Sequence, residues 1–437
     1  MTGPALAGSL FVVLLIFIGL RMPIAIALFM VGAIGMTMET SFEQLLIWVE
    51  AAPVGRTASY PLSVIPLFLL MGHLALHCGL SSVLYESARA WFGHRRGGIA
   101  VATIGGCAAF GAICGSSIAT GATMAAVSLP EMRKLGYSGA LSTGCLAAGG
   151  TLGILIPPSI ILVIYAIITE QSIGDLFLAA VIPGLLAMLY YIIAIIIYVR
   201  FSPESGPAAE RVGWKERIIS LKYVWPILVI FFVVIGGIYE GVFTPTEGAA
   251  VGAASTGVMA WVRKISWEAF KEALIDTAKI TGMIYLILIG AEIYGSYMAL
   301  SELPLSIAEM ISGTQLSPFM VVILILVIYI GLGAVMDGLA MILITVPVFL
   351  PILLGLDLGM SNEAKAIWFG ILVLSVVETG LITPPVGLNV YVINSLAPDV
   401  SLVETFKGVV PFVISDFFRL ATIVGFPAVA LWAPGLL

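Results

Sequence analysis

Two short stretches decide the fold: Gly153-Ile-Leu-Ile-Pro-Pro-Ser159 and Gly380-Leu-Ile-Thr-Pro-Pro-Val386. Each places a glycine and a proline pair inside a long apolar run. Proline cannot continue a helical hydrogen-bond ladder, and glycine adopts backbone conformations that other residues avoid. A helix broken within a membrane exposes backbone carbonyls, which are tolerated only where they line a protein cavity. Such breaks at corresponding places in two halves of a chain indicate the binding site of a transporter.

The composition is that of a polytopic membrane protein. Of the 437 residues, 60% are hydrophobic and 10% are charged, whereas soluble domains carry about 25% charged residues. A membrane span needs roughly 20 apolar residues, and the longest polar piece, 201–222, is only a loop. The net charge of −6 and the lack of a basic block argue against nucleic-acid binding.

Cysteine and histidine give no sign of a metal site. The cysteines lie in apolar segments without CxxC spacing, which predicts buried apolar side chains rather than disulfides or metal ligands; they are Cys78, Cys107, Cys114 and Cys145. His73 and His77 fit one helix face, but no third ligand is apparent. Residues 1–20 lack a basic leader, so we expect them to form the first span.

Apolar runs between polar or Pro/Gly breaks predict the spans. Simple spans are expected near 5–20, 23–38, 62–80, 184–200, 223–239, 245–262, 280–300 and 412–431. The longer regions 98–129 and 318–352 are interrupted midway, and broken spans follow them at 138–168 and 362–397. Amphipathic segments, expected along the membrane interface, lie at 82–92, 266–278 and 401–410.

Ordered anchors at a nearly constant offset indicate an internal duplication. Pro23 and Pro245 are 222 positions apart (245 − 23), and Pro157 and Pro384 are 227 apart (384 − 157). Both interrupted regions fall between these anchors. We therefore expect two repeats, 1–222 and 223–437, each with a hairpin and a broken helix.

The distribution of basic residues predicts the orientation of these repeats. If 98–129 and 318–352 are re-entrant hairpins, nearly all lysines and arginines share one side, and only Arg56 and Lys365 fall in loops opposite. By the positive-inside rule the basic side is cytoplasmic, which places both termini outside. The first repeat then starts outside and the second inside, so the repeats are expected to be inverted.

The first hairpin carries the tip Cys114-Gly-Ser-Ser-Ile-Ala-Thr120. Its small residues let two short helices meet closely. Hydroxyls and free carbonyls at such a tip suit a small alkali cation, and free amides at a helix N-terminus suit an anion. Close helix packing is the alternative, because glycine, alanine and serine are the usual interface residues in membranes.

The second hairpin carries Gly333, Asp337 and Gly338. A carboxylate in mid-bilayer costs about 2.5–3.5 kcal/mol on insertion scales, so it is normally paired or lines an aqueous cavity. No lysine or arginine lies between Lys279 and Lys365 to pair with it. Asp337 is therefore expected in a cation site, in a cap on the helix that begins at Gly338, or in both roles.

The broken helices are expected to face the hairpin tips. Carbonyls toward the first tip would come from Gly153, Ile156 and Pro158; those toward the second would come from Gly380, Thr383 and Val386. Asn389 is expected to bond either a substrate carboxylate or a neighbouring helix. Other membrane acids, expected at interfaces or in pairs, are Glu247, Glu292 and Glu378, and Asp416 is expected to pair with Arg419 on its own helix.

Taken together, these motifs resemble the large, DctM-like permease subunit of tripartite ATP-independent periplasmic (TRAP) transporters over essentially the whole chain. The motifs that carry the resemblance are Pro23-Ile-Ala, Gly115-Ser-Ser-Ile-Ala-Thr120, both double-proline stretches with Asn389, Thr244-Pro-Thr-Glu247 and Met336-Asp337. The resemblance implies an all-α fold of the ion transporter superfamily, with scaffold spans interleaved with a moving elevator domain.

The function implied by the resemblance is secondary active transport, not catalysis. It implies sodium-coupled uptake of a carboxylate, such as a C4-dicarboxylate or a sialic acid, across the bacterial inner membrane. The implied partners are a small four-helix membrane subunit and a periplasmic solute-binding protein. Since the sequence shows no additional region for the small subunit, that subunit is expected as a separate polypeptide.

The resemblance also implies which residues bind the cargo, because sodium in that family lies between each hairpin tip and the adjacent broken helix. The first sodium site would comprise Ser116, Ser117, Gly153, Ile156 and Pro158. The second would comprise Gly333, Asp337, Gly380, Thr383 and Val386. The carboxylate would be held between the tips by Ser117, Thr120, Asp337, Gly338, Pro385 and Asn389.

Other functions stay open at the level of sequence. A single-component sodium/divalent-anion symporter of the same superfamily would need no binding protein. A polytopic membrane enzyme would need clustered acids or histidines at a membrane face, which the sequence does not show. A passive channel fits less well, because inverted broken helices favour alternating access.

Overall fold

The computed structural model describes residues 3–312, 316–334 and 336–436, and within them the chain is helical without a strand. Six helices in this part of the chain are long and apolar enough to span a membrane, and a bent helix pair at 139–168 gives a seventh. Five shorter apolar helices accompany them. The structure confirms the predicted all-α polytopic membrane fold.

The first half of the chain contains these elements in order: α1 (Gly3–Gly19), α2 (Ile24–Glu39), α3 (Phe42–Thr57), η1 (Tyr60–Ser63), α4 (Val64–His77), α5 (Leu80–Phe92), α6 (Gly98–Cys114), α7 (Ser117–Lys134), α8 (Gly139–Leu155), α9 (Ile160–Ile168), α10 (Ile173–Phe201) and η2 (Pro203–Ser205). The two interruptions predicted here, at 115–116 and 156–159, are both present.

The second half contains these elements in order: α11 (Trp214–Tyr239), α12 (Pro245–Val262), α13 (Trp267–Leu300), α14 (Leu303–Ser312), α15 (Pro318–Gly333), α16 (Gly338–Leu354), α17 (Asn362–Ile382), α18 (Leu388–Leu396), α19 (Leu402–Gly425) and α20 (Ala428–Leu431). The predicted interruptions between α15 and α16 and between α17 and α18 are present; Val335, at the second tip, lies outside the described residues.

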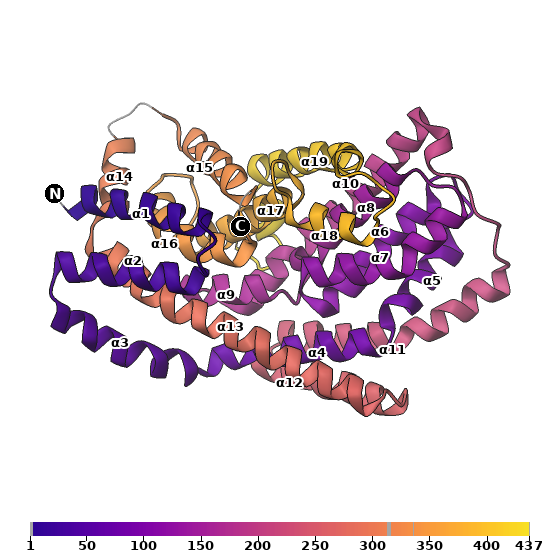
Figure 1. Ribbon diagram of the computed structural model, residues 1–437, viewed down its shortest axis with the longest axis horizontal. Coiled ribbons are helices and arrows are strands. Elements are labelled where there is room, and N and C mark those ends of the chain that lie inside the picture. Colours follow the sequence, from indigo (N-terminus) through magenta and orange to yellow (C-terminus); the bar gives the residue numbers. More distant parts are fainter. Residues whose placement is uncertain (1–2, 313–315, 335, 437) are drawn as a thin grey trace.

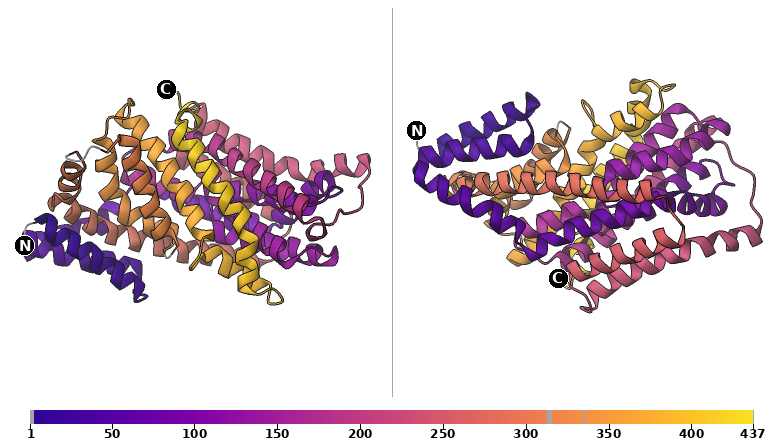
Figure 2. Two further views of the ribbon diagram at one scale, coloured as in Figure 1. Left: turned by 90° about the horizontal axis from the view of Figure 1, so that it is seen from above. Right: turned by 60° about the horizontal axis from the view of Figure 1, so that its bottom comes forward.

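Two layers organise the helices. α3, α4, α11, α12 and α13 run along the lower edge of the molecule in Figure 1, and Figure 2 shows the same layer from another side. Helices of the two halves pack on each other here, since α2 of the first half packs along α13 of the second and α12 packs along α4. Such packing is expected of two related halves, although the boundary between repeats and their inversion relative to the membrane stay predictions.

The second layer holds both hairpins and both broken helices, with its core at α8 and α17. Every residue of α17 from Ala364 to Ile382 is buried, as is every residue of α8 from Leu141 to Leu155. Burial on every side means that other helices, not lipid, surround both of these helices. The two helices that lead into the breaks, α8 and α17, are therefore fixed in position by packing on every side.

Two predicted interfacial segments are wrong as separate elements. Residues 266–278 are the first turns of α13, and residues 401–410 are the first turns of α19, which continues through Pro411. α13 has 34 residues, about 50 Å at 1.5 Å per residue, which exceeds a hydrocarbon core of about 30 Å. Its amphipathic turns therefore lie on the same helix as the apolar span.

Other boundaries also shift. The span predicted at 184–200 begins at Ile173, and the last span ends at Gly425, before the short helix α20. The hairpins extend to Lys134 and Leu354. Sequence reasoning did not identify α3 or α14, whereas the amphipathic segment at 82–92 is confirmed as α5.

Candidate functional site

The first hairpin tip is a tight turn held by its own residues. Gly115 follows α6 with φ of 65°, a left-handed conformation that suits glycine. Ser116 then caps α7, because its side chain accepts a hydrogen bond from the Ala119 amide at 3.4 Å. The predicted meeting of two short helices at small residues is confirmed.

The first helix break lies directly against this tip. α8 and α9 are inclined by 43° across the break. A Cβ on Gly153 would lie 2.8 Å from the Ser116 carbonyl oxygen and 2.5 Å from Thr120 Oγ1. A Cβ on Gly115 would lie 3.2 Å from the Pro158 carbonyl oxygen. The tip and the break therefore approach each other through backbone atoms, and glycine is required for that approach.

The second hairpin tip is capped by its carboxylate. Asp337 Oδ1 accepts hydrogen bonds from the amides of Leu339 at 3.0 Å and Ala340 at 3.1 Å, at the start of α16. The predicted capping role is confirmed. Both bonds end on one oxygen, so Oδ2 lies outside this cap.

The second break repeats the arrangement of the first. A Cβ on Gly380 would lie 2.6 Å from Gly333 Cα, which brings the end of α15 onto α17. The Thr383 hydroxyl donates its proton to the Thr379 carbonyl at 2.6 Å. The lone pairs of the Thr383 oxygen take no part in this bond. Pro385 is exposed and Val386 is half-buried.

A cavity of about 220 Å³ joins the two hairpin tips. Of the predicted substrate residues it is lined by Ser117, Asp337 and Gly338, together with Ser116. Its described lining contains no lysine or arginine. α4 and α13 close the opposite side with residues that sequence reasoning did not select: Leu69, Gly72, His73, Leu76, Ile280, Met283 and Ile284.

Thr120 and Asn389 lie behind the first tip instead of lining this cavity. Asn389 Nδ2 donates to the Ala147 carbonyl of α8 at 3.3 Å, which is the alternative of pairing with a neighbouring helix. Among the residues that the structure describes, Asn389 Oδ1 is buried without a hydrogen-bond partner, and the buried Thr120 Oγ1 has only the weakly bonding Cys114 thiol beside it. Unpartnered buried polar atoms are rare, so a role of both residues toward substrate stays a prediction.

The other acidic residues expected in membrane segments each have an ion-pair or hydrogen-bond partner. Arg419 lies 3.1 Å from Asp416, as predicted, and also 3.4 Å from Glu378. Glu292 forms an ion pair with Arg56. Glu247 completes a capping box on α12, with its carboxylate 2.8 Å from the Thr244 amide.

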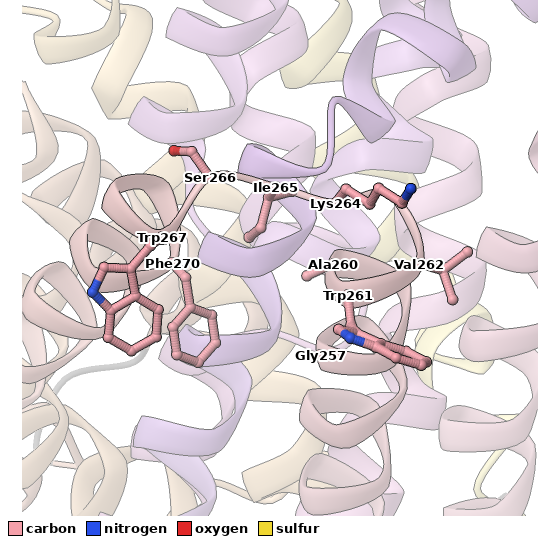
Figure 3. A pocket seen from close by; sticks show the side chains of 9 residues that line it. All are labelled: Gly257, Ala260, Trp261, Val262, Lys264, Ile265, Ser266, Trp267 and Phe270. Carbon is pink, nitrogen blue, oxygen red and sulfur yellow. The ribbon is translucent and has the colours of Figure 1, made fainter.

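A larger cavity of about 690 Å³ lies at the turn between α12 and α13, away from the tips (Figure 3). Trp267 and Phe270 stack on each other with ring centroids 5.6 Å apart, and Trp261 lies on the far side of the cavity. Exposed tryptophans beside Lys264 are typical of a membrane–water interface. None of the described tip or break residues lines this cavity.

A helical membrane body with two paired tips and breaks around a shared cavity defines a multi-pass membrane transporter. Comparison with protein families identifies the transporter family. Residues 11–429 match the family model described as "Tripartite ATP-independent periplasmic transporter, DctM component". The chain belongs to this family and is a large permease subunit of the TRAP type.

Relatives of the chain carry names with different substrates. The chain is 37% identical over 86% of its length to the C4-dicarboxylate TRAP transporter large permease protein DctM of Pseudomonas aeruginosa, covering 87% of that protein. It is 32% identical over 86% of its length to the isethionate permease DctMQ of Oleidesulfovibrio alaskensis, covering 58% of it. It is 29% identical to the sialic acid permease SiaM of Vibrio cholerae, with 88% of each chain covered.

The solved structure of the YdaH transporter of Alcanivorax borkumensis shares the fold. The TM-score is 0.65 at 15% identity, with 94% of this chain and 97% of that chain covered. At this identity the likeness concerns the fold alone. All the named relatives are transporters or permeases.

Proposed function

We propose that this permease takes up an organic anion across the bacterial inner membrane by symport with sodium. The observation that carries the proposal is the cavity between the tips, in which each tip is closed against its own broken helix. Such discontinuous helices supply the two chemistries that symport needs: helix N-termini for an anion, and free carbonyls for a cation.

Sodium would lie between each tip and its break. At the first, the carbonyls of Ser116 and Pro158 meet the glycines of the opposite segment. At the second, the uncapped Asp337 oxygen and the Thr383 hydroxyl supply ligands beside Gly333 and Gly380. The same kind of oxygen ligand at both places supports two sodium ions, with a carboxylate only at the second.

The anion would lie in the cavity between the two sodium sites. α7 begins at Ser117 and α16 begins at Gly338, and both residues line the cavity. Helix N-termini present free amides and the positive end of the helix dipole to an anion. The Ala119, Leu339 and Ala340 amides are used by the caps. With no arginine in the described lining, the remaining amides of the two first turns and the Ser117 hydroxyl would hold the carboxylate or a similar acid group. The relatives' named substrates, a C4-dicarboxylate, a sialic acid and isethionate, are all organic acids.

Transport would occur by an elevator movement of the layer that contains the tips and breaks. α4 and α13 border the cavity from the other layer, so sliding past them would carry the bound ions from one side to the other. Both termini would face the periplasm. A small four-helix membrane subunit and a periplasmic binding protein would complete the transporter, and the binding protein would select the substrate.

Uptake assays in proteoliposomes test this function. With the small subunit, the cognate binding protein and an inward sodium gradient, we expect uptake of the organic acid. Uptake that persists unchanged without sodium contradicts the coupling. Uptake by the permease without a binding protein would instead support a single-component symporter.

A further inference from the structure

A polar cluster lies at the centre of the second layer, where α8, α10, α17 and α19 meet. Arg419 Nη2 lies 3.1 Å from Asp416 Oδ1, and Arg419 Nη1 lies 3.4 Å from Glu378 Oε2. The side chains of these three residues are at most 1% exposed. Arg419 also donates to the Ser375 carbonyl of α17 at 3.2 Å.

Tyr191 extends this cluster into the first half of the chain. Its hydroxyl donates to Asp416 Oδ2 at 3.0 Å and lies 3.1 Å from Thr151 Oγ1. Thr151 donates its own proton to the Ala148 carbonyl of α8 at 2.7 Å, so its contact with Tyr191 is a close approach of the two hydroxyl oxygens. The two halves also meet directly here, because α8 packs against α17.

The connected residues occupy equivalent places in the two halves. Thr151 lies two residues before Gly153 and Glu378 lies two residues before Gly380, so they are 227 positions apart (378 − 151), as are the proline pairs. Tyr191 on α10 and Arg419 on α19 are 228 apart (419 − 191). The cluster therefore joins the two helix breaks just ahead of the glycines that contact the tips.

Stability alone does not explain such a cluster. Burying two carboxylates and a guanidinium removes their hydration, and well-packed apolar residues of similar volume are often as stabilising or more so. What a hydrogen-bonded network provides instead is a fixed orientation. Here it fixes α8 relative to α17, which carry the two proposed sodium sites.

We propose that Arg419, Glu378, Asp416, Tyr191 and Thr151 are positioning residues that couple the two sodium sites, so that filling one orders the other. This proposal rests on the proposed sodium symport. Coupling of this kind is reciprocal and makes the sodium dependence of uptake cooperative, with a Hill coefficient above 1.

Tyr191→Phe is the most selective test. The ring stays packed edge-on against Phe412, with centroids 5.5 Å apart, and only the bridging hydroxyl is lost. In the complete transporter we expect the half-saturating sodium concentration for uptake to rise about threefold or more and the Hill coefficient to fall toward 1. Thr151→Val removes the hydroxyl that lies against Tyr191 and should act in the same direction.

Tyr190→Phe is the matched control. The Tyr190 hydroxyl lies 3.0 Å from Thr422 Oγ1, so it also bridges α10 and α19, but it does not contact the cluster. Its sodium dependence should equal that of the wild type. Equal changes in Tyr190→Phe and Tyr191→Phe would overturn the proposal, because they would reflect a general loosening of the helix pair.

A double-mutant cycle separates coupling from local damage. In an Asp337→Asn background, where the second sodium site is weakened, Tyr191→Phe should have little further effect on half-saturation. A full additional effect overturns the coupling, as does wild-type uptake that depends on sodium with a Hill coefficient of 1. Wild-type uptake that does not depend on sodium overturns the proposed function itself.

Discussion

At the scale of single residues, Asp337 combines two tasks in one carboxylate. Oδ1 caps α16 through the amides of Leu339 and Ala340, and Oδ2 lies outside that cap. Asparagine is about as good an N-cap as aspartate. The two tasks can therefore be separated by a single substitution.

Asp337→Asn should keep the cap but weaken sodium binding. We expect normal membrane insertion and a half-saturating sodium concentration raised about tenfold, since one lost charge interaction of about 1.4 kcal/mol gives that factor. Uptake measured against sodium concentration checks this. The control is Asp276→Asn, which removes a carboxylate from the polar part of α13, where it pairs with Lys279 at 3.3 Å. Unchanged sodium affinity in Asp337→Asn would remove this residue from the site.

Gly380→Ala should disturb the second tip. The added methyl would lie 2.6 Å from Gly333 Cα, a backbone atom that cannot rotate away. Overpacking of this kind costs about 1–3 kcal/mol, so we expect a lower Tm and strongly reduced uptake. Gly282→Ala on α13, where nothing lies within 4 Å of the added methyl, is the control. Equal Tm and uptake for both variants would contradict the close approach.

The residues of the site differ in how well sequence reveals them. The tip and break residues can be identified from the sequence, because glycine, proline and a carboxylate stand out within apolar helices. The cavity wall on α4 and α13 carries mostly ordinary apolar side chains such as Ile280 and Met283, which nothing in the sequence marks. The link from Arg419 to Glu378 joins residues 41 positions apart, and only the packing of α17 on α19 reveals it.

At the scale of elements, the helix breaks follow directly from composition, whereas helix continuity does not. Proline pairs end α8 and α17 because they interrupt the hydrogen-bond ladder. The amphipathic starts of α13 and α19 carry no such signal and simply continue into the spans. Proline alone is not decisive either, since Pro183, Pro226 and Pro411 lie inside unbroken helices.

Replacing both prolines of the first break tests that element. Pro157→Ala with Pro158→Ala restores two backbone amides and lets α8 continue toward α9. We expect the carbonyls offered to the first tip to be taken up by helical bonds and sodium-dependent uptake to be lost, while the protein still inserts. The double substitution Pro226→Ala and Pro411→Ala, in unbroken helices, should retain uptake. Normal sodium dependence without Pro157 and Pro158 would contradict the role assigned to this break.

At the scale of the whole molecule, the proposed elevator movement needs the two layers to slide past each other. Cysteines placed at Leu339 on the second tip and Ile284 on α13 both face the shared cavity. In a background without native cysteines, a bifunctional crosslinker between them should abolish uptake. A crosslink between cysteines at Leu74 of α4 and Gly257 of α12, which lie together within one layer, should leave uptake intact. Full uptake with the first pair crosslinked would contradict the elevator movement.

The central claim is that each tip and break pair carries one sodium ion with the anion. It is tested most directly by measuring the fluxes of radiolabelled sodium and radiolabelled substrate together in proteoliposomes that contain the complete transporter. We predict at least two sodium ions for each organic anion in the wild type and a lower ratio in Asp337→Asn. A substrate flux unaccompanied by sodium, or a ratio that Asp337→Asn leaves unchanged, would contradict the account.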